Sequence, residues 1–493
     1  MHTANQKNFW RSAIGSSSIR MEEVKVPELL LGYLIGPFGA MLSSGIFTSI
    51  LQNYFTDVLK LNLTFLTTLQ LTSTLLIVAA NLVIGQLIER TRALAGKARP
   101  WILLSTLTMS VACVLMFLVP FEGVAKMIWI AVAYNLYYAV AYPIYNTANS
   151  TLIAVSTRDS KKRSALASFT NIAGLGVMGV GSMIFPILVS SVLKENQSLW
   201  FSVMLAVALF TAMACYLQFK FTRERVTEEG LASKAEADTK SVVSLEKQLK
   251  AVTTDKNWWV VIVLYVLFQC SGAMKNSSMA YFCKWVMDNT FFGAASPDLW
   301  GASQSLLAIL GAIPMAVAAV FIVPMANRFG KRMVVFLGML LGVIGGTLAG
   351  LANGGVVMTA VGVALKCLGS SPACYLILAM LADVIDHVEY KSGIRTDGLT
   401  MSIYSSIMVA STPVCNAIFS AMLEAVGYNQ YADVALGTIA QTAAVKGTIA
   451  TSYIWIETLA YGLCALLILL FTVEKNLSRE QAEIAKRNSS AKV

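Results

Sequence analysis

The chain has 493 residues, of which 56% are hydrophobic and only 13% are charged, and its mean hydropathy is +0.66. Soluble domains carry about 25% charged residues, so this composition excludes an ordinary soluble enzyme and favours a membrane protein. The net charge of +10 would suit nucleic-acid binding if the basic residues shared one face. They lie instead in short loops between apolar stretches, which argues against a nucleic-acid partner.

Twelve apolar stretches recur along the chain, and each is long enough to cross a bilayer as a helix of about twenty residues. Lipid cannot hydrogen-bond a backbone, so each stretch is predicted to be a helix with its own bonds satisfied. The stretches lie at about 29–52, 65–88, 101–119, 127–152, 165–192, 199–219, 258–286, 302–325, 333–351, 356–383, 397–425 and 451–472.

Basic residues fall in alternate loops, and the intervening loops hold at most single lysines. Loops rich in Lys and Arg stay on the cytoplasmic side of a membrane. The pattern predicts a multi-pass protein of the inner (cytoplasmic) membrane with both termini in the cytoplasm. The basic groups are Arg90, Arg92, Lys97 and Arg99; Arg158, Lys161, Lys162 and Arg163; Arg328, Lys331 and Arg332; and Lys391 and Arg395.

One charged segment, 220–256, divides the stretches into two sets of six. Its apolar residues have the spacing of a short helix lying along the membrane or the protein, and a flexible linker is the alternative. The predicted parts are a cytoplasmic N-terminal segment (1–27), an N-terminal bundle (28–219), the cytoplasmic central loop (220–256), a C-terminal bundle (257–473) and a cytoplasmic tail (474–493). This organisation predicts an all-α membrane protein of two pseudo-symmetric six-helix bundles, with a transport site near mid-membrane.

Motifs of soluble enzymes are absent from the sequence. There is no GxxxxGK[ST] phosphate loop, and the GLGVMG segment that begins at Gly174 lies inside an apolar stretch rather than after a strand. His387 is the only histidine beyond position 2, which excludes a histidine-based metal centre. We therefore expect no enzymatic activity, no metal and no cofactor other than a coupling ion.

Four segments resemble the glycoside–pentoside–hexuronide:cation symporter family of the major facilitator superfamily. They are GYLIGPFG (32–39) with YFTDVL (54–59), GKARPW (96–101), KNSSMAYFCKWV (275–286) and LADVIDHVEYKSGIRTDGL (381–399). The last is similar to the family's ADxxDYxEYKxGxRxxG stretch. The resemblance implies the twelve-helix major facilitator fold, alternating access, and sugars or glycosides as substrates.

The chain departs from this family where the coupling cation is expected to bind. The family usually places aspartates in the second span, about where Ile77 and Asn81 stand here. A hard cation such as Na⁺ prefers anionic and carbonyl oxygens, and a proton needs a titratable group. Sugar-contacting acids are also missing near Met41 and Ala141. The coupling ion, H⁺ or Na⁺, is therefore open.

Tyrosines and amides of the fourth stretch are candidate substrate contacts. Aromatic faces stack on the C–H faces of sugars, and amides bond to their hydroxyls. The alternative is that some of the tyrosines belong to an interfacial aromatic belt. The predicted substrate-binding residues of this stretch are Tyr137, Tyr145, Asn146 and Asn149.

Two lysines, Lys275 and Lys366, are predicted to lie about 15–17 Å deep, near mid-membrane. No carboxylate is expected at that depth, because Glu457 and Glu424 flank the outer loop 426–450 and are expected to face water. Two unpaired cations would favour an anionic substrate. The alternatives are that one lysine snorkels or pairs with another helix end. Further predicted substrate contacts are Asn276, Tyr404 and Ser405.

A group of charges at the cytoplasmic end of the tenth stretch is predicted to form a network that locks one state of alternating access. A static surface cluster is the alternative. The predicted members are Asp383, Asp386 and Glu389, with Arg90, Arg92 and Arg99 as partners.

The sequence thus predicts a monomeric secondary transporter that imports a sugar, a glycoside or an acidic hexuronide-type saccharide by cation-coupled symport. Its predicted partners are the saccharide and the lipid bilayer. The alternatives are a uniporter or exchanger without cation coupling, and a non-transporting sensor built on a transporter fold.

Overall fold

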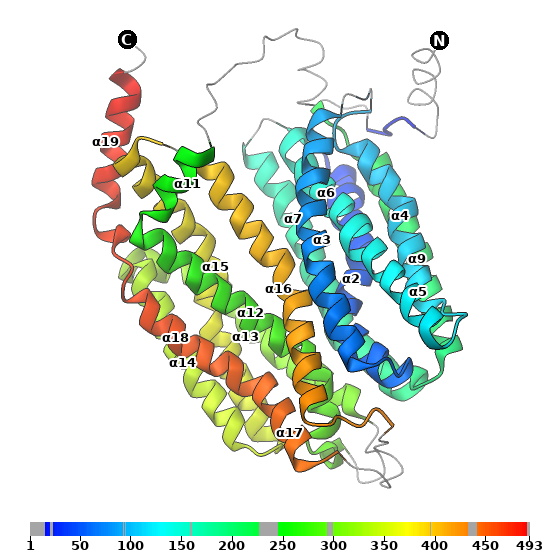
Figure 1. Ribbon diagram of the computed structural model, residues 1–493. Coiled ribbons are helices and arrows are strands. Elements are labelled where there is room, and N and C mark those ends of the chain that lie inside the picture. The colour runs from blue at the N-terminus through cyan, green and yellow to red at the C-terminus, as the bar shows by residue number, and fades with distance from the viewer. Residues whose placement is uncertain are drawn as a thin grey trace. The chain divides into compact units, whose positions relative to one another are not determined.

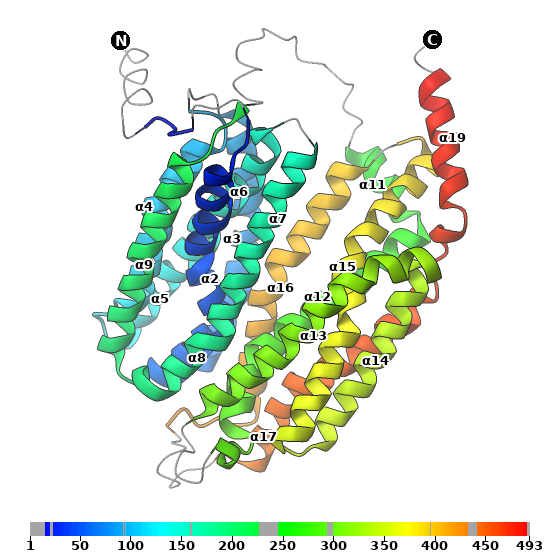
Figure 2. The same cartoon turned by 180° about the vertical axis from the view of Figure 1, so that it is seen from behind.

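The computed structural model describes residues 15–19, 23–91, 93, 95–157, 160–225, 245–292, 299–394, 396–431 and 441–490. Within these ranges, twelve helices are long and apolar enough to cross a membrane, which confirms the predicted all-α membrane fold. The chain separates into two compact units, Met1–Ala237 and Asp238–Val493, and each contains six of the spans (Figures 1 and 2).

Unit 1 contains the first six spans, and three of them include π-helical turns. Such turns shift the helical register and are frequent at functional sites. The elements are η1 (Glu28–Ile35), α2 (Gly36–Asn53), η2 (Tyr54–Val58), α3 (Leu63–Arg90), α4 (Arg99–Phe117), α5 (Gly123–Asn135), η3 (Leu136–Ala141), α6 (Tyr142–Ser156), α7 (Ser160–Gly179), η4 (Val180–Ile184), α8 (Phe185–Leu188), η5 (Val189–Leu193) and α9 (Gln197–Lys220).

Unit 2 contains the last six spans and, among the described residues outside them, the helices α11 and α19 and the short 3-10 helix η6. The short helix α11 covers the described part of the amphipathic pattern in the central loop. The elements are α11 (Leu245–Thr253), α12 (Lys256–Trp285), η6 (Asn289–Phe292), α13 (Trp300–Phe329), α14 (Lys331–Leu351), α15 (Val356–Ser392), α16 (Asp397–Ala425), α17 (Ala443–Ala450), η7 (Thr451–Trp455), α18 (Ile456–Ile468), η8 (Val473–Lys475) and α19 (Leu477–Ser490).

In both units, a carboxylate from a distant part of the chain caps the N-terminus of the third span. In unit 1, the carboxylate of Glu224 accepts hydrogen bonds from the backbone N–H groups of Lys97, Ala98 and Arg99 at 2.6–2.8 Å. In unit 2, Glu474 accepts from Lys331 at 2.6 Å and from Arg332 at 3.2 Å. Each carboxylate satisfies unpaired N–H groups and the positive end of a helix dipole.

Glycines bring α14 and α15 into close contact. A Cβ atom added at Gly345 would lie 2.7 Å from the carbonyl oxygen of Gly362, and one added at Gly362 would lie 2.7 Å from that of Gly345. Such backbone approach is typical of small residues at membrane helix interfaces. It places α15, which carries Lys366, directly against α14.

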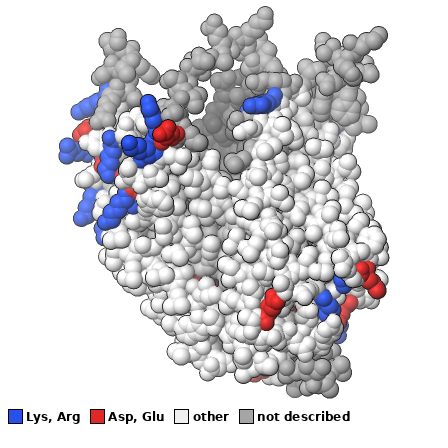
Figure 3. Space-filling model, in the orientation of Figure 1, with Lys and Arg blue, Asp and Glu red and all other residues white. Residues whose placement is uncertain are grey.

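The outer surfaces of the units are apolar where lipid would contact them. Large side chains such as Leu75, Val320 and Leu466 are more than 60% exposed. On the face seen in Figure 3, charged side chains gather toward the ends of the helices and leave the middle uncharged. This distribution fits a bilayer better than water.

Candidate functional site

Three charged side chains from three spans of unit 2 lie together in its interior: Lys275 on α12, Lys366 on α15 and Glu457 on α18. We refer to them as the charge triad. Lys366 Nζ lies 2.5 Å from Glu457 Oε2, and Lys275 Nζ lies 3.4 Å from Oε1. The side chains of Lys366 and Glu457 are 0% and 1% exposed, whereas that of Lys275 is 22% exposed.

Two tyrosines complete the surroundings of the triad. The Tyr461 hydroxyl donates to Glu457 Oε1 at 2.6 Å. Lys366 donates to the carbonyl oxygen of Tyr453 at 3.3 Å and lies 5.2 Å from the centre of its ring. Tyr453 belongs to the π-helical turn η7. The triad is therefore contacted by two consecutive parts of the last span, η7 and α18.

The predictions that the two lysines lack an acidic partner and that Glu457 faces water are wrong. The last span begins at Ala443, not at 451. Glu457 therefore lies fourteen residues inside the span, which corresponds to about 21 Å of helix. A carboxylate at that depth needs cationic partners, and both lysines supply them. Glu424 is exposed, as expected.

The triad has one net positive charge when all three groups are ionised, because one carboxylate faces two ammonium groups. Lys366 is enclosed and closely paired. Lys275 is partly exposed, and its contact with Glu457 is longer than the 2.7–2.9 Å or so of a charge-assisted hydrogen bond. Of the two predicted lysines, Lys275 is therefore the one placed to meet a ligand.

The remaining residues predicted on unit 2 are not part of the triad. Asn276 is partly exposed and follows Lys275 on α12. The Tyr404 ring of α16 stacks on Tyr265 of α12, with ring centroids 4.2 Å apart. Ser405 is exposed.

In unit 1, three of the predicted substrate contacts are buried in hydrogen bonds between helices. Tyr145 donates to Gln218 Oε1 at 2.8 Å, and Gln218 Nε2 donates to Asn149 Oδ1 at 2.7 Å. Tyr137 bonds to Ser43 at 2.8 Å. Asn146 is partly exposed. Gln218 was not predicted, although a glutamine near the end of an apolar stretch is an available signal.

The position expected for the coupling cation contains no carboxylate. Asn81 Nδ2 donates to the carbonyl oxygen of Ile77 at 2.9 Å, within the same helix. Ile77 is only 1% exposed. The amide oxygen of Asn81 is the only side-chain oxygen that these two residues could offer a cation.

The predicted network residues of unit 2 have partners inside that unit. Lys331 Nζ donates to Asp383 at 2.6 Å, and Gln481 of α19 donates to Asp386 at 2.9 Å. Glu389 is partly exposed. In unit 1, the Arg99 guanidinium donates to the carbonyl oxygens of Phe219 and Ala95. Arg90 is exposed, and Arg92 lies outside the described residues.

His387 connects three elements at the same end of unit 2. Its Nδ1 lies 2.7 Å from Glu480 of α19, and its Nε2 lies 3.5 Å from Asp255, which precedes α12. Lys391 donates to Asp255 at 2.8 Å. Burial raises the pKa of Asp255, but hydrogen bonds from Lys391 and the Trp258 N–H outweigh it and leave that pKa below its usual value. The carboxylate therefore stays charged and holds Lys391.

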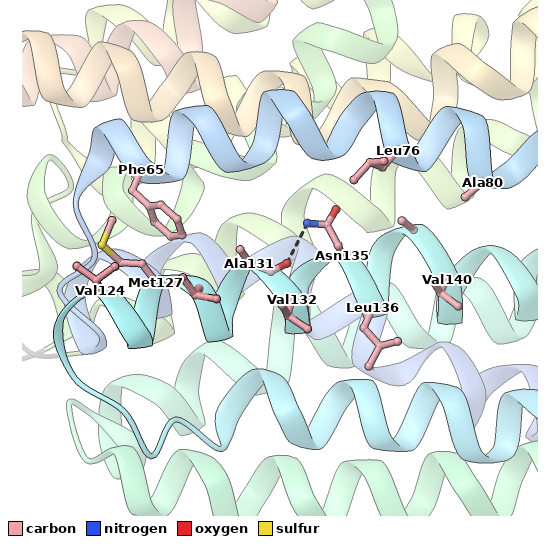
Figure 4. Close-up of a pocket in the computed structure, with 12 residues that line it drawn as sticks. Phe65, Leu76, Ala80, Val124, Met127, Ala131, Val132, Asn135, Leu136 and Val140 are labelled. Carbon is pink, nitrogen blue, oxygen red and sulfur yellow. Dashed lines mark hydrogen bonds between the residues drawn. The ribbon is translucent and has the colours of Figure 1, made fainter.

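An apolar pocket of ≈ 910 Å³ lies in unit 1 between α3 on one side and α5 with η3 on the other (Figure 4). The one amide among its lining residues, Asn135, donates from Nδ2 to the carbonyl oxygen of Ala131 at 2.9 Å. Saccharides need many hydrogen-bond partners, so this pocket is not suited to them. Its lining residues are Phe65, Leu76, Ala80, Val124, Met127, Ile128, Ala131, Val132, Asn135, Leu136, Ala139 and Val140.

Comparison with known proteins adds three similar sequences. The family described as MFS/sugar transport protein matches residues 32–475. An isoprimeverose transporter of Lactiplantibacillus pentosus is 26% identical, over 93% of this chain and 91% of its own length. A putative glycoside/cation symporter of Escherichia coli K12 is 26% identical, over 77% and 79%. A glucuronide carrier protein homolog of the same organism is 21% identical, over 81% and 84%.

Two solved structures share the fold. A nucleoside transporter aligns with a TM-score of 0.60 at 12% identity, over 91% of this chain and 98% of its own. A peptide transporter aligns with a TM-score of 0.57 at 13% identity, over 94% and 98%. At such identities the likeness concerns the fold alone, and both proteins are transporters rather than enzymes.

Proposed function

The chain belongs to the MFS/sugar transport protein family, and we propose that it imports a saccharide or glycoside by alternating access, coupled to a cation. It is a multi-pass membrane protein, with twelve helices among the described residues that are long and apolar enough to cross a bilayer. We further propose that it lies in the cytoplasmic membrane with both termini in the cytoplasm and acts as a monomer. The alternation of basic loops along the sequence supports this orientation.

The observation that carries the proposal is the charge triad. Charged side chains in the middle of membrane spans are costly, and they mark substrate and ion pathways. The triad joins three spans of unit 2, and the side chain of Lys275 is partly exposed. Ammonium groups and neighbouring amides are the donors that sugar hydroxyls accept from.

The relatives suggest which saccharides to test. The isoprimeverose transporter and the glucuronide carrier homolog are named for a neutral and an acidic sugar compound respectively. We propose that the substrate of this chain belongs to the same broad class of small saccharides and glycosides. We test H⁺ first as the coupling ion: Ile77 and Asn81 offer no carboxylate for Na⁺, and a proton would have to use a titratable group elsewhere in the chain.

The test is uptake by proteoliposomes that contain the purified chain. Isoprimeverose, methyl β-D-xyloside, methyl β-D-glucoside and methyl β-D-glucuronide are offered with and without an imposed proton gradient. We expect at least one to accumulate when the gradient is present. Uptake that is insensitive to ion gradients would instead indicate a uniporter or exchanger. Binding without uptake would indicate a sensor.

A further inference from the structure

We propose that Glu457 is a built-in competitor for an acidic group of the substrate, and that Lys275 exchanges Glu457 for that group when substrate binds. The inference rests on the proposed function and deepens it. It makes Lys275 and Glu457 the residues that determine which substrate charge is accepted.

The first step is the charge balance of the triad. Two ammonium groups and one carboxylate leave one positive charge in the interior of unit 2. Burying an uncompensated charge is costly. A bound carboxylate or sulfonate would make the set neutral, whereas a neutral sugar would leave the excess charge in place.

The second step is the difference between the two lysines. Lys366 is 0% exposed, lies 2.5 Å from Glu457 and also donates to the Tyr453 carbonyl oxygen. Lys275 is 22% exposed and lies 3.4 Å from Glu457. Among the described residues, Glu457 is the one partner of the Lys275 ammonium. Lys275 can therefore turn to a new acceptor at lower cost than Lys366 can.

The third step is what happens to Glu457 when Lys275 leaves it. Its Oε1 keeps the hydrogen bond from Tyr461 at 2.6 Å, and its Oε2 keeps Lys366. The carboxylate remains paired within unit 2 after the exchange. This exchange of ion-pair partners makes and breaks no covalent bond and transfers no proton.

The experiment uses matched glycosides that differ only in charge: methyl β-D-glucuronide against methyl β-D-glucoside, and methyl α-D-galacturonide against methyl α-D-galactoside. Affinities are measured by thermal shift and calorimetry on the full purified chain, because a ligand that binds only the folded state stabilises it. We expect the wild type to bind an acidic member more tightly than its neutral counterpart.

Two variants should shift the affinity for the acid in opposite directions. Lys275→Gln should weaken binding of the acid about tenfold to a hundredfold, the range for losing a hydrogen bond to a charged group. It should leave the neutral counterpart nearly unchanged, and Lys275→Arg should preserve acid binding. Glu457→Gln removes the competitor and should strengthen binding of the acid.

Control variants separate this effect from a general loss of folding. Lys284→Gln makes the same charge change on the same helix, where Lys284 lies over the Trp285 ring, and should leave both affinities unchanged. If Glu457→Gln does not fold, Glu457→Asp shortens the competitor while keeping its charge. It should strengthen acid binding by a smaller factor.

The inference is overturned if the wild type prefers the neutral glycosides, or if the Lys275 and Glu457 variants shift acid binding in the same direction. In the first case the proposed saccharide transport still stands. If no saccharide stabilises the chain and none is taken up, the proposed function fails and the inference fails with it.

Discussion

At the scale of single residues, Tyr461 is the one hydroxyl that supports the charge triad within the described part of unit 2. It donates to Glu457 at 2.6 Å and is 3% exposed. A carboxylate with two oxygens can accept about four hydrogen bonds, so this donor shares the stabilisation of the charge with the lysines. The tyrosine donates to Oε1, the same carboxylate oxygen that lies 3.4 Å from Lys275.

We expect Tyr461→Phe to lower the stability of the chain by about 1.5–3 kcal/mol, because a hydrogen bond to a buried charged group is lost. Thermal unfolding of the purified protein in detergent measures the change. Tyr375→Phe is the matched control, since Tyr375 on α15 is 43% exposed. Equal losses in the two variants would show that the hydroxyl of Tyr461 does not support Glu457.

Lys275 and Lys366 could be recognised from sequence as mid-membrane charges, but their partner could not. The apolar run of the last span is interrupted by Lys446 and Gly447, so hydropathy places its start too late and Glu457 too near the surface. The structure extends the span to Ala443. Similarly, Tyr145 and Asn149 are identifiable as polar residues in a span, whereas their shared partner Gln218 lies on α9, far along the chain, and only the folded unit brings it to them.

At the scale of elements, glycines position the helices that carry the triad. Gly342 of α14 leaves room for the Tyr461 ring, because a Cβ atom there would lie 2.7 Å from Tyr461 Cδ2. Gly345 brings α14 against Gly362 of α15. Gly342 and Gly345 both belong to the segment GMLLGVIGG (338–346), in which small residues recur at the spacing that lets membrane helices approach closely.

We expect Gly345→Ala to destabilise the chain by about 1–3 kcal/mol, since the new Cβ would overlap backbone atoms that cannot move independently. The measurement is the midpoint temperature of thermal unfolding in detergent, which should be lower in the variant. The control is Gly447→Ala in α17, where a Cβ would meet nothing within 4 Å. A Gly345→Ala protein as stable as the control would contradict the close packing of α14 on α15.

The C-terminal helix α19 is attached to α15 through polar contacts. The pair between Glu480 and His387 is buried, with the two side chains 7% and 10% exposed. Gln481 bonds to Asp386 beside it. Because α19 has a strongly polar composition, these contacts should account for most of its docking.

Glu480→Gln should therefore release α19 from α15. Hydrogen exchange of the backbone amides of 477–490 is expected to become about tenfold faster or more, which corresponds to the loss of a charge-assisted bond. Glu483→Gln on the same helix is the control and should change the exchange much less. Similar exchange in both variants would mean that α19 is held by other contacts.

At the scale of the whole molecule, the number of spans and their approximate limits follow from hydropathy, because a bilayer imposes one length on every helix. The carboxylate caps on the third span of each unit do not follow from hydropathy. Glu224 and Glu474 each lie far along the chain from the helix they cap, and only the folded units bring them to Lys97 and Lys331. Long-range pairing of this kind leaves no local pattern in the sequence.

Coupling is a property of the whole transport cycle, and the second span bears on it directly. With isoleucine at 77 and an amide at 81, whose nitrogen bonds to the Ile77 carbonyl oxygen, the position lacks the anionic oxygens that a hard cation prefers. We expect an inward Na⁺ gradient to stimulate saccharide uptake by proteoliposomes little or not at all. Asn81→Asp restores one carboxylate and should increase the response to Na⁺, while Asn81→Ala should behave as the wild type does. Strong Na⁺-dependent uptake by the wild type that disappears in Asn81→Ala would refute this prediction, because the amide oxygen would then serve the cation in place of an acid.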